Sequence, residues 1–278
     1  MSYLEQLFQF HFMQNAMLAG TLVALLAGAA GYFVVLRGQS FAAHMLSQVG
    51  FPGAAAGVLF HLSPVIGLVA FCVVAALGIR AGGRGLEAGQ RGESAAVGSI
   101  LAFALGLGLL FFRLYRGSAQ GVYGFLFGSL LGISDRDVAV TAAATVVTLA
   151  ALAAITRPLI FASVDAEVAE ARGVPVRALS TAFLLIVALS VAVTVQVIGT
   201  LLIFALLVAP GASAVQLTAR PLLGLALTIL LALAFTWLGL AVAYFSGYPV
   251  GFFVTSLAFG FFGLVRVLRF ARVRLQPA

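Results

Sequence analysis

Few side chains within the long apolar runs of this sequence can bind a ligand, and three of them lie together. His44, Ser47 and Gln48 stand at the start of one such run. A helix would place His44 and Gln48 on the same face, so that both side chains can line one cavity. Neutral imidazole is a common transition-metal ligand, and a polar ionisable group within a membrane marks a functional candidate because its burial is costly. Two interpretations stay open for His44: a ligand in a path, or an interfacial residue that bonds a carbonyl or a headgroup.

The other polar side chains are weaker candidates for a functional site. Gln196 ends an apolar run and could line the same path or simply cap a helix. His61 precedes Ser-Pro and is expected in a loop, and His11 is expected in an interfacial N-terminal segment. Phosphate-binding glycine loops, Gly-x-Ser-x-Gly motifs and carboxylate pairs within a run are all missing from the sequence. The single Cys72 excludes a disulfide framework. We therefore expect no enzymatic activity in this chain and no permanently bound cofactor.

The composition requires a lipid environment. Hydrophobic residues make up 63% of the 278 residues and charged residues 8%, against about 25% in soluble domains. The sequence predicts an all-α, polytopic transmembrane helix bundle of about eight or nine spans, with one short cytoplasmic helix. One membrane domain would cover 1–278, with an outer interfacial or N-terminal segment at 1–15, a cytoplasmic segment at 157–177 and a cytoplasmic tail at 268–278. The candidate spans are 16–36, 45–60, 63–79, 94–112, 138–155, 179–197, 199–217, 221–245 and 249–267.

The arginines predict the orientation of the bundle. All 15 basic residues are Arg, and they stand between apolar runs, without the recognition motifs of a nucleic-acid-binding protein. Short Arg-rich loops stay on the cytoplasmic side. The groups at 80–91, 157–177 and 266–274 are separated by even numbers of predicted spans, so all three fit that side. Nine spans then put the N-terminus outside, and merging one short pair would move it inside.

Two further segments are candidates for a part in a conformational change. Gly199 and Pro210 bracket one apolar run with helix breakers, which is typical of transporters but equally compatible with a structural kink. In the cytoplasmic segment, Ser163 is a candidate N-cap, acidic residues follow it, and Gly173 is a candidate C-terminal stop. This pattern predicts a helix of two to three turns outside the bilayer. That helix would be either a solvated connector or a docking element for a cytoplasmic partner.

Six motifs in order resemble the membrane-spanning subunit of bacterial ABC importers for zinc and manganese, the family-3 metal permeases. The resemblance runs from about Ala16 to Leu268. Its motifs are Phe33–Arg37 with Phe41–Gly57, Glu93–Gly98, Gly128–Ser134, Asp165–Gly173, Val197–Ala214 and Gly247–Gly251, of which Val197–Ala214 is the most specific.

The resemblance implies the working parts of such a permease. Asp165, Glu167, Glu170 and Gly173 would form the helix that couples the bundle to ATPase subunits, and Gly199 and Pro210 would act as hinges. The implied partners are two cytoplasmic ATP-binding subunits, an external metal-binding lipoprotein or periplasmic protein, and a second copy of this chain. The implied location is the bacterial cytoplasmic membrane, where lipid surrounds the spans.

One departure from the family concerns the cargo. The family's second helix usually carries Asp followed four residues later by His, and here His44 and Gln48 occupy those positions. A neutral pair binds a divalent cation more weakly. We expect His44 and Gln48 to contact a transported metal, with zinc first and manganese second. A metal chelate or other small solute is the alternative cargo, and an ATP-independent secondary transporter or channel is the alternative class.

Overall fold

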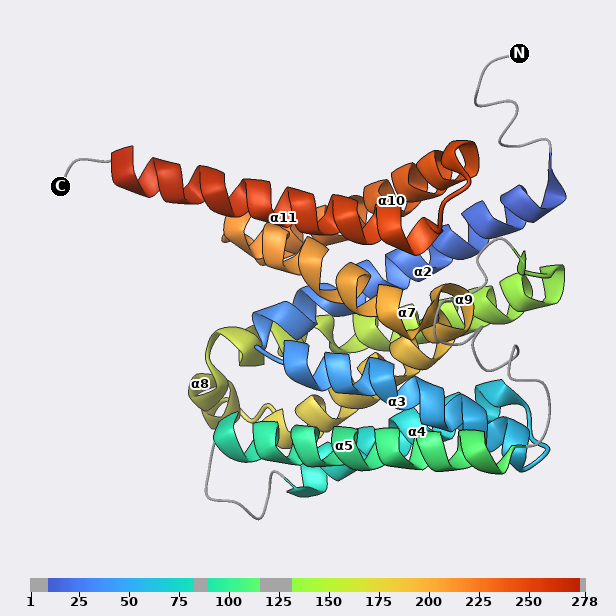
Figure 1. Ribbon diagram of the computed structural model, residues 1–278. Helices are drawn as coiled ribbons and strands as arrows, with labels where there is room; N and C mark the ends of the chain where they lie inside the picture. Colours follow the sequence, from blue (N-terminus) through green and yellow to red (C-terminus); the bar gives the residue numbers. More distant parts are fainter. Residues whose placement is uncertain (1–9, 83–89, 116–131, 276–278) are drawn as a thin grey trace.

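The computed structural model describes residues 10–82, 90–115 and 132–275, and within them all side chains except those at 90–93, 201 and 272–275. Every long element in these ranges is an α-helix (Figure 1), so the expected all-α class is confirmed. The helices are α2 (His11–Leu36), α3 (Ser40–Leu59), α4 (Pro64–Gly82), α5 (Gln90–Leu114), α7 (Asp135–Val164), α8 (Ala166–Ala171), α9 (Val176–Leu217), α10 (Pro221–Ser246) and α11 (Val250–Leu275). Residues 1–9 of the expected outer segment, most of the Gly128–Ser134 motif and residues 276–278 lie outside the described ranges.

The described helices are long enough to form the expected membrane bundle. Seven of them contain segments that are long and apolar enough to cross a membrane. The second part of α9, Leu202–Leu217, is a shorter apolar segment. The 20-residue α3 falls outside the seven because His44 and Gln48 lower its mean hydropathy, yet it lies alongside the others (Figure 1). With these two segments, the prediction of eight or nine spans is confirmed.

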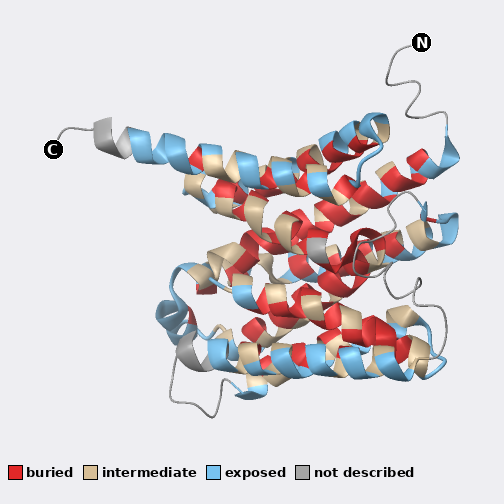
Figure 2. Ribbon diagram, in the orientation of Figure 1, coloured by how far each residue is buried: buried red, intermediate tan, exposed pale blue. Residues whose placement is uncertain are grey.

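The core of the bundle is built from α2 and α9. Of the residues in the spanning part of α2, 72% are buried, and of those in Val176–Thr200, 78%, against 17% in α5 (Figure 2). Small residues allow this close packing. A Cβ atom added to Gly31 in α2 would lie 2.0 Å from the carbonyl oxygen of Leu207 in α9. These two helices therefore form the centre, while α5 presents most of its surface outward.

The helix ends that carry arginines predicted to be cytoplasmic lie together at one end of the bundle, as the sequence predicts. Arg37 follows α2 and Arg80 lies in the last turn of α4, and their guanidinium groups bond the neighbouring residues Ser180 and Thr181 near the start of α9. The short helix α8 and the last turns of α11 lie at this same end, and the start of α2 lies at the opposite one (Figure 1). The predicted cytoplasmic arginines therefore gather at one end of the molecule.

Candidate functional site

The first expected site residue, His44, lies one turn into α3 and faces the second part of α9. Its imidazole packs edge-on against Phe204, with 4.7 Å between ring centroids and an angle of 66° between the planes. The Nδ1 atom is buried and has no hydrogen-bond partner in the described part of the chain. Leaving a buried polar atom unpaired costs about 1–3 kcal/mol, so an unpaired buried atom in a folded protein needs a structural or functional explanation. A ligand that is present only during transport is one such reason.

The second expected residue, Gln48, follows one turn later on the same helix. It is half-buried, as His44 is. The hydroxyl of Ser47, the third residue of the group, donates to the backbone carbonyl of His44 at 2.6 Å, so it turns back onto its own helix. The structure therefore separates the three residues: His44 and Gln48 share a face, and Ser47 has its partner within α3.

Pro52 adds a backbone oxygen to this face. It lies inside α3, where a proline has no amide hydrogen to give to the residue four positions earlier. That residue is Gln48, whose carbonyl therefore lacks the donor of the regular helical ladder. The sequence shows a proline four residues after Gln48. This spacing frees the Gln48 carbonyl only if the helix continues through Pro52, and the structure shows that it does.

The position of α3 is fixed by its close approach to α4. A Cβ atom added to Gly67 in α4 would lie 2.1 Å from the carbonyl oxygen of Gly53. The hypothetical Cβ atom of Gly50 would also touch Leu68 of α4 and Val195 of α9. Since α3 is held closely on this side, His44 and Gln48 have a defined place beside the second part of α9.

The two expected hinges differ in geometry. Gly199 has φ 80° and ψ 164°, a non-helical conformation inside α9, and the chain reverses direction there (Figure 1). An L-residue rarely adopts such angles, so this break depends on glycine. Pro210 is buried within a helical stretch. The adjacent Gly211 packs against Gly31 of α2, where an added Cβ would lie 2.9 Å from the carbonyl oxygen. A hinge at either residue remains a prediction.

The expected coupling helix is present as α8, with a different cap. Asp165, and not Ser163, is its N-cap, because the carboxylate accepts a bond from the amide of Val168 at 2.9 Å. Ser163 belongs to the last turn of α7 and donates to Leu159. The helix has six residues, which is shorter than the two to three turns expected. Gly173 closes it with φ 82°, as the sequence predicted.

The surface of α8 has two sides. Ala169 is fully buried against the bundle, whereas Glu167 and Glu170 are exposed. Arg37 lies behind this segment: it donates to Ser163 at 3.3 Å and to Ser180 at 2.6 Å, and its guanidinium lies 5.7 Å from the ring centroid of Phe183. The sequence did not predict that Arg37 joins α2 to both flanks of α8.

The remaining polar candidates lie away from His44 along the chain. Gln196 is half-buried, three residues before the break at Gly199. His61 is exposed in the turn after α3, with φ 56°. His11 was expected in an interfacial segment, but it opens α2, and its Nε2 lies 2.8 Å from the carboxylate of Asp135 at the start of α7. In the described residues no group of three or more His, Cys, Asp or Glu side chains could hold a metal ion.

Known proteins share this architecture along nearly the whole chain. The family described as ABC 3 transport family matches residues 9–268. The chain is 30% identical over 218 residues to the manganese transport system membrane protein MntC of Halalkalibacterium halodurans, covering 78% of this chain and 74% of that protein. It is 29% identical over 213 residues to the manganese import system permease protein ScaB of Streptococcus parasanguinis, covering 76% and 74%. Among solved structures, PsaBC from Streptococcus pneumoniae in complex with Fab matches with a TM-score of 0.84 and 27% identity, covering 95% of this chain and 94% of that one.

Proposed function

This chain belongs to the ABC 3 transport family as a membrane-spanning permease of the bacterial cytoplasmic membrane, and from that premise we propose that it imports a divalent transition metal. The sequence placed zinc before manganese. MntC and ScaB are both manganese proteins, so we place manganese first and zinc second. As a permease, the chain is a transport subunit, and ATP would be hydrolysed on a separate cytoplasmic chain. Membership of this ABC family rules out the alternative class, an ATP-independent secondary transporter or channel.

The buried, unpaired Nδ1 of His44 is the observation that carries the proposal. With the side chain of Gln48 and its backbone carbonyl, it offers one nitrogen and two oxygen atoms from consecutive turns of α3. Imidazole suits zinc and amide or carbonyl oxygen suits manganese. These donors are neutral and few for a divalent cation. A second copy of the chain would double them, which supports a homodimer with the path between the copies.

Coupling to ATP would pass through α8. Its exposed face carries Glu167 and Glu170 beside Val168, which is 44% exposed. Such a face fits a cleft on each of two ATP-binding subunits. A push on α8 would reach α2 through Arg37, and α2 leads directly into α3. An external metal-binding protein would deliver the cargo at the opposite end of the bundle.

Uptake into proteoliposomes tests the metal site. The permease is reconstituted with its ATP-binding subunit inside and the external binding protein outside, and uptake of radioactive manganese and zinc is measured. We expect His44→Ala with Gln48→Ala to lower ATP-dependent uptake about tenfold or more. Each substitution removes one polar contact with the cation, and a hydrogen bond to a charged group is worth about 1.5–3 kcal/mol. The matched control is His61→Asn, an exposed histidine whose φ of 56° asparagine tolerates. Unchanged uptake in the double variant would refute the site.

The neutral pair also favours a second candidate cargo. A metal chelate or another small solute needs no carboxylate ligand, and His44 and Gln48 provide none. In the same proteoliposomes this alternative predicts that free manganese and zinc are not transported by the unmodified protein, even though ATP is hydrolysed. The metal content of the purified binding protein separates the cargoes, because a chelate transporter would have a partner that carries no bare ion.

A further inference from the structure

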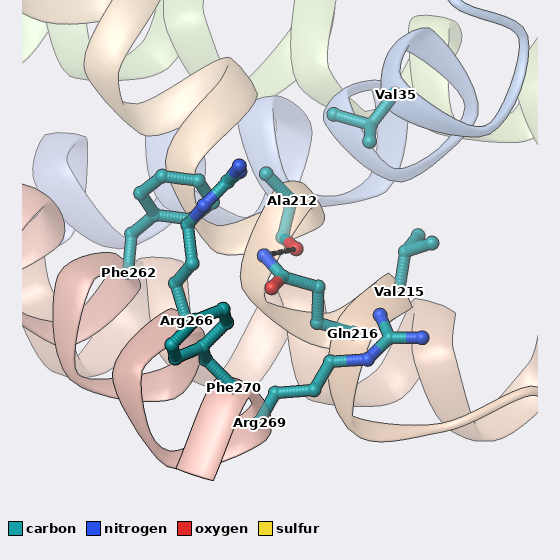
Figure 3. Close-up of a pocket in the computed structure, with 8 residues that line it drawn as sticks. All are labelled: Val35, Ala212, Val215, Gln216, Phe262, Arg266, Arg269 and Phe270. Carbon is teal, nitrogen blue, oxygen red and sulfur yellow. Dashed lines mark hydrogen bonds between the residues drawn. The ribbon is translucent and has the colours of Figure 1, made fainter. Parts of the chain in front are cut away.

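A groove beside the C-terminal helix has no part in the proposed metal path. It has a volume of about 550 Å³ and is formed by the ends of α2 and α9 and the second half of α11 (Figure 3). The lining residues are Val35, Ala212, Val215, Gln216, Phe262, Arg266, Arg269 and Phe270. Four of them, Phe262, Arg266, Arg269 and Phe270, follow a helical spacing that places them on one face of α11. The groove is thus part basic and part apolar.

The two arginines of the groove differ from Arg37 and Arg80, which lie at the ends of α2 and α4. Arg37 and Arg80 bond hydroxyl groups of α9, whereas Arg266 and Arg269 are exposed and make no hydrogen bond or ion pair with the described residues. No acidic side chain lines the groove. In Figure 3 the two guanidinium groups lie on either side of Gln216, that of Arg266 toward Ala212 and that of Arg269 toward Val215. The Gln216 amide donates to the carbonyl of Ala212 at 3.0 Å, which leaves its oxygen available to accept. The groove therefore offers two cations without a counter-charge.

The place of these arginines along α11 points to the membrane boundary. Arg266 and Arg269 lie about 24 and 28 Å along the helix axis from its first residue, at 1.5 Å per residue, and the hydrocarbon core is about 30 Å thick. Val267 and Leu268, between them in the chain, are 66% and 55% exposed. Apolar side chains exposed at this level face lipid tails. The groove therefore opens where the headgroups of the cytoplasmic leaflet meet their acyl chains.

We propose that this groove binds an anionic phospholipid of the cytoplasmic leaflet, with its phosphate between Arg266 and Arg269. Basic pockets between transmembrane helices on the cytoplasmic side are suited to such headgroups, and arginine matches phosphate with its planar fork of donors. Phe262, Phe270 and Val215 supply the apolar surface on which the first part of an acyl chain lies. The bound lipid joins α11 to the ends of α2 and α9.

Native mass spectrometry of the purified permease complex tests this proposal, with phosphatidylglycerol and phosphatidylcholine added in turn. We expect phosphatidylglycerol to bind the unmodified protein more tightly than phosphatidylcholine. Arg266→Gln with Arg269→Gln should weaken phosphatidylglycerol binding roughly 25-fold, at about a fivefold loss for each arginine near the surface. The matched control is Arg157→Gln with Arg220→Gln, which removes the same charge from two exposed arginines at the same end. It should bind as the unmodified protein does.

Two further arms make the result decisive. Arg266→Lys with Arg269→Lys keeps the charge but loses the planar fork of donors, so it should bind phosphatidylglycerol more tightly than the glutamine pair and less tightly than the unmodified protein. Inorganic phosphate at millimolar concentration should not displace the lipid, because the acyl contacts are missing. Equal loss in the two glutamine pairs would show general surface attraction and overturn the site. So would unchanged lipid binding together with loss of the ATP-binding subunit, which would assign the groove to that partner.

Discussion

At the scale of single residues, α3 contains two polar groups that lack their usual hydrogen-bond partners. His44 keeps a buried nitrogen without a partner, and Pro52 withdraws the donor that would occupy the carbonyl of Gln48. Both features cost stability: a proline in a helix interior is about 3 kcal/mol less favourable than alanine. Because the two costs fall on consecutive turns of one face, the proposed role of this face in holding cargo would account for both.

Replacing Pro52 by Ala tests this explanation. The new amide would bond the Gln48 carbonyl, so we expect metal uptake to fall roughly tenfold, the worth of one hydrogen bond to a charged group. The melting temperature should stay unchanged or rise, because the helix gains a bond. Pro158→Ala in α7 is the control: it restores a helical donor at another interior proline and should leave uptake unchanged. Uptake at the normal rate in Pro52→Ala would remove the carbonyl from the path.

The sequence predicted part of this site and could not predict the rest. The spacing of His44 and Gln48 was enough to place them on one face of a helix, because that face depends only on local periodicity. The contact with Phe204 depends on how α3 packs against a segment 160 residues later in the chain. Ser163 shows the same limit: its type suits a helix cap, but α7 continues past it, and Asp165 takes that role.

At the scale of elements, α9 changes direction within itself, at Gly199. The breakers at Gly199 and Pro210 were equal in the sequence, but only Gly199 leaves the helical conformation. The difference arises because a proline still permits helical angles in its own residue, whereas φ 80° with ψ 164° is open mainly to glycine. Gly199 lets the chain turn back inside α9, and Phe204 in the second part then reaches His44.

Gly199→Ala tests the importance of this break. We expect it to destabilise the protein by about 1–3 kcal/mol, the cost of holding an L-residue in a sparsely populated backbone region, and to lower the melting temperature in detergent. Gly98→Ala in α5 is the matched control, because that glycine is helical and an added Cβ meets nothing within 4 Å. There a small gain is expected, since alanine is favoured over glycine in helices. Equal melting temperatures for both variants would mean that the break tolerates a side chain.

At the scale of the whole molecule, charge sets orientation and packing sets position. The arginine count along the chain was enough to predict which loops share a side, and the convergence of Arg37 and Arg80 on Ser180 and Thr181 agrees with it. The centre of the bundle was beyond such reasoning. Nearly all spans are apolar on every side, so hydropathy does not distinguish the buried α2 from the outward-facing α5. Their packing partners decide that difference.

Single-cysteine labelling in whole cells tests the orientation of the bundle and whether an odd number of crossings separates α3 from α8. The native Cys72 is fully buried and will not react with a membrane-impermeant maleimide. Leu62→Cys, in the turn between α3 and α4, should be labelled from outside, because Leu62 is 53% exposed and this turn lies at the end of the bundle opposite α8 (Figure 1). Val168→Cys, in α8, is 44% exposed but should react only after the cells are opened. The reverse pattern would invert the bundle. Labelling of both from outside would mean that an even number of crossings separates Leu62 from Val168, whereas α4, α5 and α7 give an odd number. Because the proposed docking of an ATP-binding subunit requires α8 on the cytoplasmic side, only the first pattern is compatible with the proposed coupling through α8.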